Sequence, residues 1–275
     1  MITILCLILY NCNKSFKIDK YSNKKSSDEK EKNKFKEEDD FSSLLDEASN
    51  GNTKKVKELL EKGANPNILD NIGNTPLMLA ANNGYKKIVK LLLIKGASPD
   101  TSNIYGDTSL ITLVFQAILS PRCEEIVKLL LNVGIKNIDF KNDDGKNSLM
   151  TAASGMHLGV VKLLLSKGAN PNVVDTYGNT SLMQLCMDKA FYVPYQLKIV
   201  KLLIKAGTNI NAKNVYGETA LMISVSRENE NIVRLLLNST IEDINAKNNK
   251  KYTSLLTVAC RGNKNIMKLL LKKRC

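Results

Sequence analysis

The sequence contains no tryptophan, one histidine and only six prolines in 275 residues. Its six cysteines include no CxxC pair and follow no regular spacing, so neither a zinc site nor a disulfide framework is indicated. The lone His157 cannot form a multi-histidine metal site, and no Ser and Asp partners stand at a spacing that suggests a triad, so we expect a surface or helix-capping histidine. No GxxxxGK[ST] phosphate loop occurs. The sequence therefore predicts no catalytic residue, no metal site and no cofactor.

Acidic residues are also in the minority. The formal net charge is +13, from 40 Lys and Arg against 27 Asp and Glu. Residues 1–40 hold nine Lys and eight acidic residues, so residues 41–275 carry +12, with 31 basic residues against 19 acidic ones. Such an excess either attracts an acidic partner, a nucleic acid or an anionic membrane, or it solvates helix faces, since most lysines stand between apolar positions. Of the two interpretations, the sequence favours solvation.

The N-terminus opens with an apolar run, Ile2 to Tyr10, which is followed by Asn11 and Cys12. The run is too short to span a bilayer, which takes about 20 residues, but it has the length of a signal-peptide core. Its end resembles a bacterial lipobox, which implies a lipoprotein signal at residues 1–12 with Cys12 lipidated. No Lys or Arg precedes the run, and Asn11 is larger than usual before such a cysteine. A cleaved signal without lipid and a fortuitous apolar N-terminus on a cytoplasmic protein are the alternatives.

Residues 13–40 are dense in charge of both signs and poor in apolar side chains. Such a segment cannot bury enough apolar surface to offset the entropy lost on ordering. We therefore expect a disordered tether between the N-terminus and a folded domain at residues 41–275.

The remainder of the sequence repeats itself. The turn glycines Gly73, Gly106, Gly145, Gly178 and Gly217 are separated by 33, 39, 33 and 39 residues, and Lys251 takes the same place 34 residues later. Each begins a similar block, and a second apolar block such as "IVKLLL" follows it. The first blocks are "GNTPLMLAA", "GDTSLITLV", "GKNSLMTAA", "GNTSLMQLC", "GETALMISV" and "KYTSLLTVA".

This pattern resembles the ankyrin-repeat family, whose signature is T-P-L-H-x-A at a period near 33 residues. The resemblance covers residues 41–275 in seven copies, of which the first is degenerate, and it implies an all-α solenoid of helix-turn-helix repeats with β-turn fingers. Local chemistry agrees with it. Thr75 and its equivalents stand where helix N-caps do, the apolar positions have helical spacing, and Gly96 can end the second helix.

Two features depart from the repeated pattern. In copy 1, Asp46 and Glu47 stand where later copies have apolar or small residues, as expected for an outward-facing cap. The signature histidine of the family, which hydrogen-bonds within and between repeats, is replaced in every copy, so we expect a more apolar, less hydrogen-bonded groove base. The replacing residues are Met78, Ile111, Met150, Met183, Met222 and Leu256.

In the ankyrin-repeat family, a partner usually meets the turn tips and the exposed face of the first helix. Tyr105, Tyr177 and Tyr216 share one tip position, and tyrosine is a common interface anchor, so we expect them to be exposed along one edge. The alternative is that each packs on its neighbour's turn. The resemblance implies partner-binding residues at Ile72, Tyr105, Asp107, Phe115, Tyr177, Tyr216, Arg227 and Arg261.

Copies 3 and 5 are longer than the others. Leu77 to Ile88 spans 11 residues in copy 2, whereas Leu110 to Ile126 spans 16 in copy 3, and copy 5 is longer by six residues at the same place. We expect these insertions to project opposite the fingers, with Pro121 and Pro194 ending the first helices or shaping the loops. Their aromatic residues either form a second contact site or fold back over the lengthened helices. They are Phe115, Phe191, Tyr192 and Tyr195.

Together these features predict a non-catalytic, monomeric scaffold that binds another protein. The lipobox resemblance places it in a bacterial cell envelope, periplasmic or on the outer membrane and attached to the membrane through Cys12, with a cytoplasmic location as the alternative. A second functional hypothesis is a basic solenoid surface that binds a polyanion or anionic membrane headgroups. Nucleic acid is the less expected partner.

Overall fold

The computed structural model describes residues 43–116, 122–187 and 193–274. Phe41–Cys275 form a compact unit of their own. The predicted signal with Cys12 and the predicted tether at residues 13–40 lie outside the described residues, as do Pro121, Phe191 and Tyr192. None of the helices in the described part of the chain is long and apolar enough to cross a membrane.

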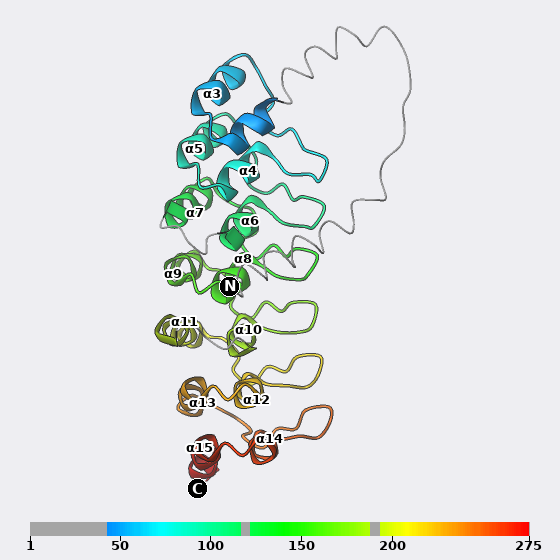
Figure 1. The fold of residues 1–275 in the computed structure, drawn as a ribbon, viewed down its shortest axis with the longest axis vertical. Helices are drawn as coiled ribbons and strands as arrows, with labels where there is room; N and C mark the ends of the chain where they lie inside the picture. The colour runs from blue at the N-terminus through cyan, green and yellow to red at the C-terminus, as the bar shows by residue number, and fades with distance from the viewer. Residues whose placement is uncertain (1–42, 117–121, 188–192, 275) are drawn as a thin grey trace, which may run out of the picture. The chain divides into compact units, whose positions relative to one another are not determined.

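The described residues form seven helix pairs, stacked one on the next (Figure 1). The first helices, here called inner, are residues 43–50, α4 (Pro76–Asn82), α6 (Ser109–Gln116), α8 (Ser148–Ser154), α10 (Ser181–Met187), α12 (Ala220–Ser226) and α14 (Ser254–Arg261). The second helices, here called outer, are α3 (Thr53–Glu61), α5 (Lys86–Ile94), α7 (Arg122–Asn132), α9 (Leu158–Ser166), α11 (Val193–Lys205), α13 (Glu230–Leu237) and α15 (Lys264–Arg274).

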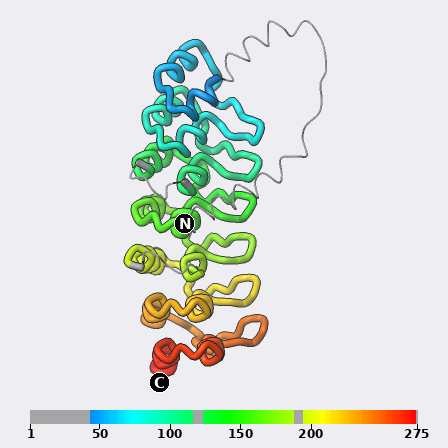
Figure 2. The backbone as a smooth tube through the Cα atoms, viewed as in Figure 1, coloured from blue at the N-terminus to red at the C-terminus, as the bar shows by residue number. Residues whose placement is uncertain are grey.

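The pairs form two rows. Each inner helix from α4 onward contacts the next inner helix, each outer helix contacts the next outer helix, and the two helices of a pair contact each other. Before each inner helix from α4 onward, the chain makes a hairpin-like finger, and the fingers project together on the side away from the outer helices (Figure 2). This is the all-α solenoid with turn fingers that the repeats predict.

The local signals explain why each helix begins and ends where it does. Thr75 Oγ1 accepts a hydrogen bond from Met78 N at 3.1 Å, Thr219 caps α12 in the same way, and Asn147 takes this role for α8. Gly96 follows the last residues of α5 with a φ of +86°, a conformation that favours glycine. The predicted caps at Thr75 and Thr219 and the predicted helix end at Gly96 are confirmed, whereas the cap at Asn147 was not predicted.

The core is continuous along the stack because each repeat buries its apolar face against the next. In copy 2 the inner helix buries Leu77, Ala80 and Ala81, and the outer helix buries Ile88 and Leu92. The small alanines let the inner helices approach closely, while the outer helices supply most of the apolar volume. A single pair could not enclose such a core, so stability depends on stacking.

The outer helices α7 and α11 of the longer copies 3 and 5 have 11 and 13 residues, against 9 in α5 of copy 2. The residues between the paired helices, 117–121 and 188–192, lie outside the described part of the chain. Pro194 does not end an inner helix, which was the first of the two roles that we expected for it. It lies in the first turn of α11, where its missing N–H would have no helical acceptor in any case. Tyr195 is 49% exposed and does not fold back over the helix.

The two ends of the stack differ. In copy 1, Asp46 is exposed and Glu47 pairs with Lys55 at 2.8 Å, consistent with an outward-facing polar cap. In copy 7, Leu256 is 46% exposed, whereas its equivalent Met222 is buried at 5% because another repeat covers it. The methionines at the signature position, Met78, Met150, Met183 and Met222, are all buried in the stack.

Candidate binding surfaces

Each finger is built around one Asn or Asp side chain, three residues before the turn glycine. Asp70 Oδ1 accepts hydrogen bonds from Ile72 N at 3.0 Å and from Asn74 N at 2.7 Å. The same pair of bonds, to the backbone N–H groups two and four residues later, recurs in all six fingers. The six residues are Asp70, Asn103, Asn142, Asp175, Asn214 and Asn248. Sequence reasoning missed this role, although an Asn or Asp stands at this place in every finger.

Backbone hydrogen bonds also join each finger to the next. Ile104 N donates to Ile72 O at 3.0 Å, and Val215 N donates to Tyr177 O at 2.9 Å. Equivalent bonds run from Asp143 to Tyr105, from Thr176 to Asp144 and from Asn249 to Tyr216. We call this row of six tips the fingertip edge. The bonds hold neighbouring tips in fixed register, so side chains on different fingers form one preorganised surface.

The fingertip edge carries much of the exposed apolar surface. Tyr177 and Tyr216 are 57% and 55% exposed, as we expected, whereas Tyr105 is half-buried and departs from the expectation. Among the described residues, seven of the twelve exposed large apolar side chains stand on the fingers: Leu69, Ile104, Val174, Tyr177, Val215, Tyr216 and Tyr252.

The centre of the edge is acidic. Asp143 and Asp144 occupy the tip of the copy 4 finger, and both are exposed. Asp144 makes a long ion pair with Lys146, at 3.8 Å. The edge therefore runs from aliphatic in copies 2 and 3, through acidic in copy 4, to aromatic in copies 5 and 6.

The stacked helix pairs with turn fingers and the repeated sequence together show the family of the chain. A family model described as ankyrin repeats (3 copies) matches residues 26–103, 44–136, 114–214 and 187–275. The chain belongs to the ankyrin-repeat family. A comparison with curated proteins finds no match.

Solved structures include many similar chains, 568 in all. One is described as the ankyrin repeat domain of Bcl-3, a unique member of the IkappaB protein family. It is 28% identical in sequence and superposes with a TM-score of 0.69, over 83% of this chain and 97% of that one. The likeness supports the order and number of repeats in this ankyrin-repeat protein.

The other predicted contact residues of the ankyrin-repeat domain lie in different settings. Arg227 is exposed at the end of α12. Arg261 lies 3.7 Å from Glu228 in an ion pair. Ile72 and Phe115 are half-buried. Asp107 is only 4% exposed, and its Oδ1 accepts from Asn142 Nδ2 of the next finger at 2.9 Å, so we leave it out of the contact surface.

Nucleophilic and titratable side chains in the interior are not arranged for catalysis. Burial raises the pKa of the Cys123 thiol to about 12 and raises that of Cys186 further, so both thiols stay protonated at neutral pH. His157 stands at the N-cap position of α9, but its side chain is half-buried and makes no capping hydrogen bond, contrary to the expected surface or capping role. Its Nε2 is buried without a hydrogen-bond partner, and burial lowers its pKa. No group of three metal-ligating side chains occurs in the described ranges.

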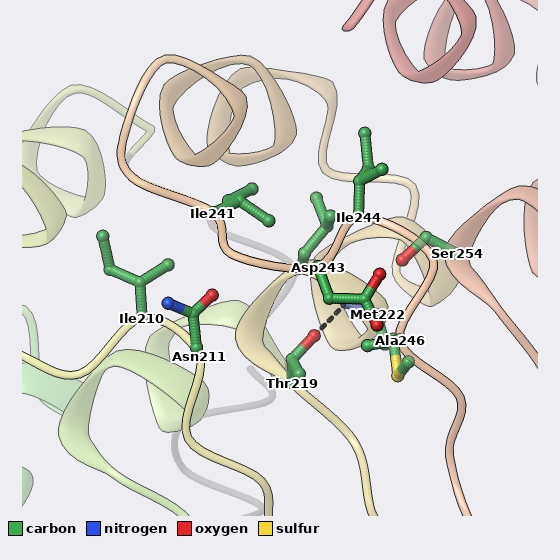
Figure 3. A pocket seen from close by; sticks show the side chains of 10 residues that line it. Ile210, Asn211, Thr219, Met222, Ile241, Asp243, Ile244, Ala246 and Ser254 are labelled. Carbon is green, nitrogen blue, oxygen red and sulfur yellow. Dashed lines mark hydrogen bonds between the residues drawn. The ribbon is translucent and has the colours of Figure 1, made fainter. Parts of the chain in front are cut away.

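Two cavities lie beneath the fingers at equivalent places in the stack. One, of about 200 Å³, is lined by Pro99, Leu110, Ile135 and Phe140, among others. The other, which is smaller, lies between copies 6 and 7 and is lined by Ile210, Met222 and Ile244 (Figure 3). Both occur where the connection from an outer helix to the next finger is longer than in copy 2. We interpret them as packing gaps left by the longer connections.

Proposed function

We propose that this ankyrin-repeat protein is a non-catalytic scaffold that binds another protein through its fingertip edge. The observation that carries the proposal is the gathering of exposed apolar side chains on the fingers. Exposed apolar groups on a soluble domain are usually scattered, and a contiguous patch marks an interaction site. Here Tyr177, Val215 and Tyr216 lie on adjacent tips that backbone hydrogen bonds hold in register.

The chemistry of the edge indicates what the partner offers. Two apolar segments flank Asp143 and Asp144, so a complementary surface carries Lys or Arg at its centre with apolar side chains on both sides. Because the fingers are rigid, little entropy is lost in ordering them on binding, which favours affinity. Tyrosine adds a large apolar ring with a polar end and has only two side-chain torsions to fix.

The test is a double variant, Tyr177→Ser with Tyr216→Ser, compared with the matched variant Tyr195→Ser. Tyr195 is similarly exposed but stands on an outer helix. We expect the double variant to lose at least about tenfold in affinity for a partner isolated with the full chain, since interface tyrosines are frequent hot spots. The control should bind normally, and both variants should unfold like the wild type. Equal binding by the double variant would refute the proposal.

We also propose that the protein is held in a bacterial cell envelope by lipid on Cys12. The support is the lipobox-like end of the apolar run and the charged segment that follows it, which suits a tether. Mass spectrometry of the N-terminus of the native protein tests this. A diacylated Cys12 is the expected result, and an intact Met1 would contradict it.

A further inference from the structure

The excess positive charge of the chain is concentrated on the outer helices. These seven helices contain 18 Lys and Arg against 5 Asp and Glu, which gives +13. The inner helices contain one basic and two acidic residues, and the rest of residues 41–275 contains 12 of each sign. The fingers and connections are thus neutral in sum, while the opposite side of the stack carries the charge (Figure 1).

One position of the outer helix is cationic in every copy. In copies 2 to 7 it lies two residues after the first buried branched residue, as Lys90 does after Ile88, and in copy 1 Lys57 stands at the same position directly after Val56. All seven side chains are exposed, and stacked helices lie about 8–10 Å apart, so they form a continuous row. We call this row the cationic ridge: Lys57, Lys90, Lys128, Lys162, Lys201, Arg234 and Lys268.

Only part of the ridge is neutralised within the protein. Lys57 pairs with Glu61 at 3.6 Å and Arg234 pairs with Glu230 at 2.6 Å, each one helical turn away. In the described part of the chain, the remaining members of the ridge make no ion pair. Lys90, Lys162, Lys201 and Lys268 have no acidic residue one turn away on their own helices. A helix surface that needed only solubility would not require this row of like charges.

Apolar side chains protrude on the same side of the molecule. Ile94 is 69% exposed and lies one turn after Lys90, on the same helix face. Val133 follows the end of α7 and is 49% exposed. Tyr195, also exposed, stands with Lys198 Nζ 5.7 Å from its ring centre. The phosphate backbone of a nucleic acid offers no apolar surface for such side chains to contact. The interface of a bilayer, by contrast, binds both apolar side chains and lysines.

We propose that the outer-helix side of this protein binds the anionic surface of a lipid bilayer through the cationic ridge, with Ile94 and Val133 entering the headgroup region. Lysine suits such a surface, because its flexible point charge follows a diffuse field rather than a fixed phosphate geometry. The fingertip edge then faces away from the bilayer and stays free to bind a protein. The proposal depends neither on the protein-binding function nor on a lipid at Cys12.

The test compares two variants of the full chain that lose the same charge. The ridge variant carries Lys90→Gln, Lys162→Gln, Lys201→Gln and Lys268→Gln. The control variant carries Lys136→Gln, Lys141→Gln, Lys247→Gln and Lys250→Gln, four exposed positions on the connections and fingers. Binding is measured by co-sedimentation with vesicles of phosphatidylcholine alone or mixed with phosphatidylglycerol, at low and high salt.

We expect the wild type and the control to bind the anionic vesicles in a salt-dependent way. The ridge variant should bind about six-hundredfold more weakly, since each of the four lysines near an anionic leaflet contributes about fivefold. An equal loss in both variants would show that net charge alone matters and would overturn the proposal. Binding unaffected by either variant would overturn it as well, because the N-terminal apolar run would then be responsible.

A third variant distinguishes the bilayer from a nucleic acid. Ile94→Asn with Val133→Asn should weaken vesicle binding at high salt and leave any binding to duplex DNA unchanged. If the wild type instead binds duplex DNA more tightly than anionic vesicles, with the same dependence on the ridge, the bilayer is the wrong partner and the proposal fails. Circular dichroism of each variant verifies that it is folded.

Discussion

At Gly106 the backbone φ is +73°, and a Cβ atom there would lie 2.9 Å from Asn142 Cα in the next finger. Gly168 has a similar φ of +86° but faces open space. We expect Gly106→Ala to lower the free energy of unfolding by about 2–3 kcal/mol, and Gly168→Ala by about 1 kcal/mol, because only the first adds a contact between fingers to the backbone strain. Urea denaturation measures both. Equal losses would show that the fingers do not pack as described.

The last finger has a lysine where the other fingers have glycine. Lys251 takes the glycine place with a φ of +62°, which is strained for lysine. No further finger stacks on it among the described residues, so only the strain remains. A side chain is therefore tolerated at this one tip.

His157 is the only histidine, which makes its titration easy to isolate. Burial lowers its pKa in the folded state, so as the pH falls below about 6.5 the unfolded chain binds the proton first. The free energy of unfolding should therefore fall as the pH drops from 7 towards 5, and then level off below the folded-state pKa. Denaturant titrations at several pH values test this.

The matched variant is His157→Asn. At the equivalent place in copies 6 and 7, Asn229 and Asn263 cap the outer helix by accepting from Ile232 N and Ile266 N. The variant should gain such a cap, be more stable at pH 7, and lose the pH dependence between 5 and 7. A pH dependence that persists in the variant would assign it to other groups.

At the scale of elements, copies 5 and 6 are linked through one buried amide. Gln196, in the first turns of α11, is fully buried, and its Nε2 donates to Leu185 O at 2.7 Å. Its Oε1 accepts from Asn229 Nδ2 of the next repeat at 3.2 Å. Through these two hydrogen bonds, the Gln196 side chain links α11 to α10 and to the N-cap residue of α13.

We expect Gln196→Leu to lower the free energy of unfolding by about 1–3 kcal/mol, because it leaves a buried carbonyl without its donor. Gln184→Leu is the control, since Gln184 is half-buried and bonds to Asp175 within its own repeat. Hydrogen exchange should show the extra opening of the first variant at the junction of copies 5 and 6. A loss of unfolding free energy no larger than that of the control would mean that the hydrogen bonds of Gln196 do not stabilise the junction.

Much of this element structure could be predicted from the sequence, because local chemistry determines it. Thr75 and Thr219 cap helices through bonds to residues three positions away, and the spacing of buried residues such as Leu77 and Ile88 is helical in the sequence itself. The burial and hydrogen bonding of side chains that contact a neighbouring repeat could not be predicted from the sequence. Tyr105 and Tyr177 share a tip position, yet they differ in burial. Likewise, Asp107 is buried and accepts a hydrogen bond from Asn142 of the next finger, a contact between repeats that the sequence does not indicate.

At the scale of the whole molecule, the repeats separate two kinds of surface. The fingers and connections are together neutral, and the fingers carry the apolar and aromatic tips and are held in register by backbone hydrogen bonds. The outer helices carry the net charge. A stack of identical units keeps such faces apart over its whole length, because each repeat contributes the same positions to the same side. We therefore assign protein binding to the fingers.

The most direct measurement is site-specific photo-crosslinking in the native cell. The photoreactive residue p-benzoylphenylalanine replaces Tyr216 on the fingertip edge in one protein and Tyr195 on the outer-helix side in another, and protein adducts are separated by mass. We expect a discrete protein adduct from position 216 and none from position 195. Protein adducts from position 195 alone would contradict this assignment, since the partner would then be bound on the opposite side of the stack.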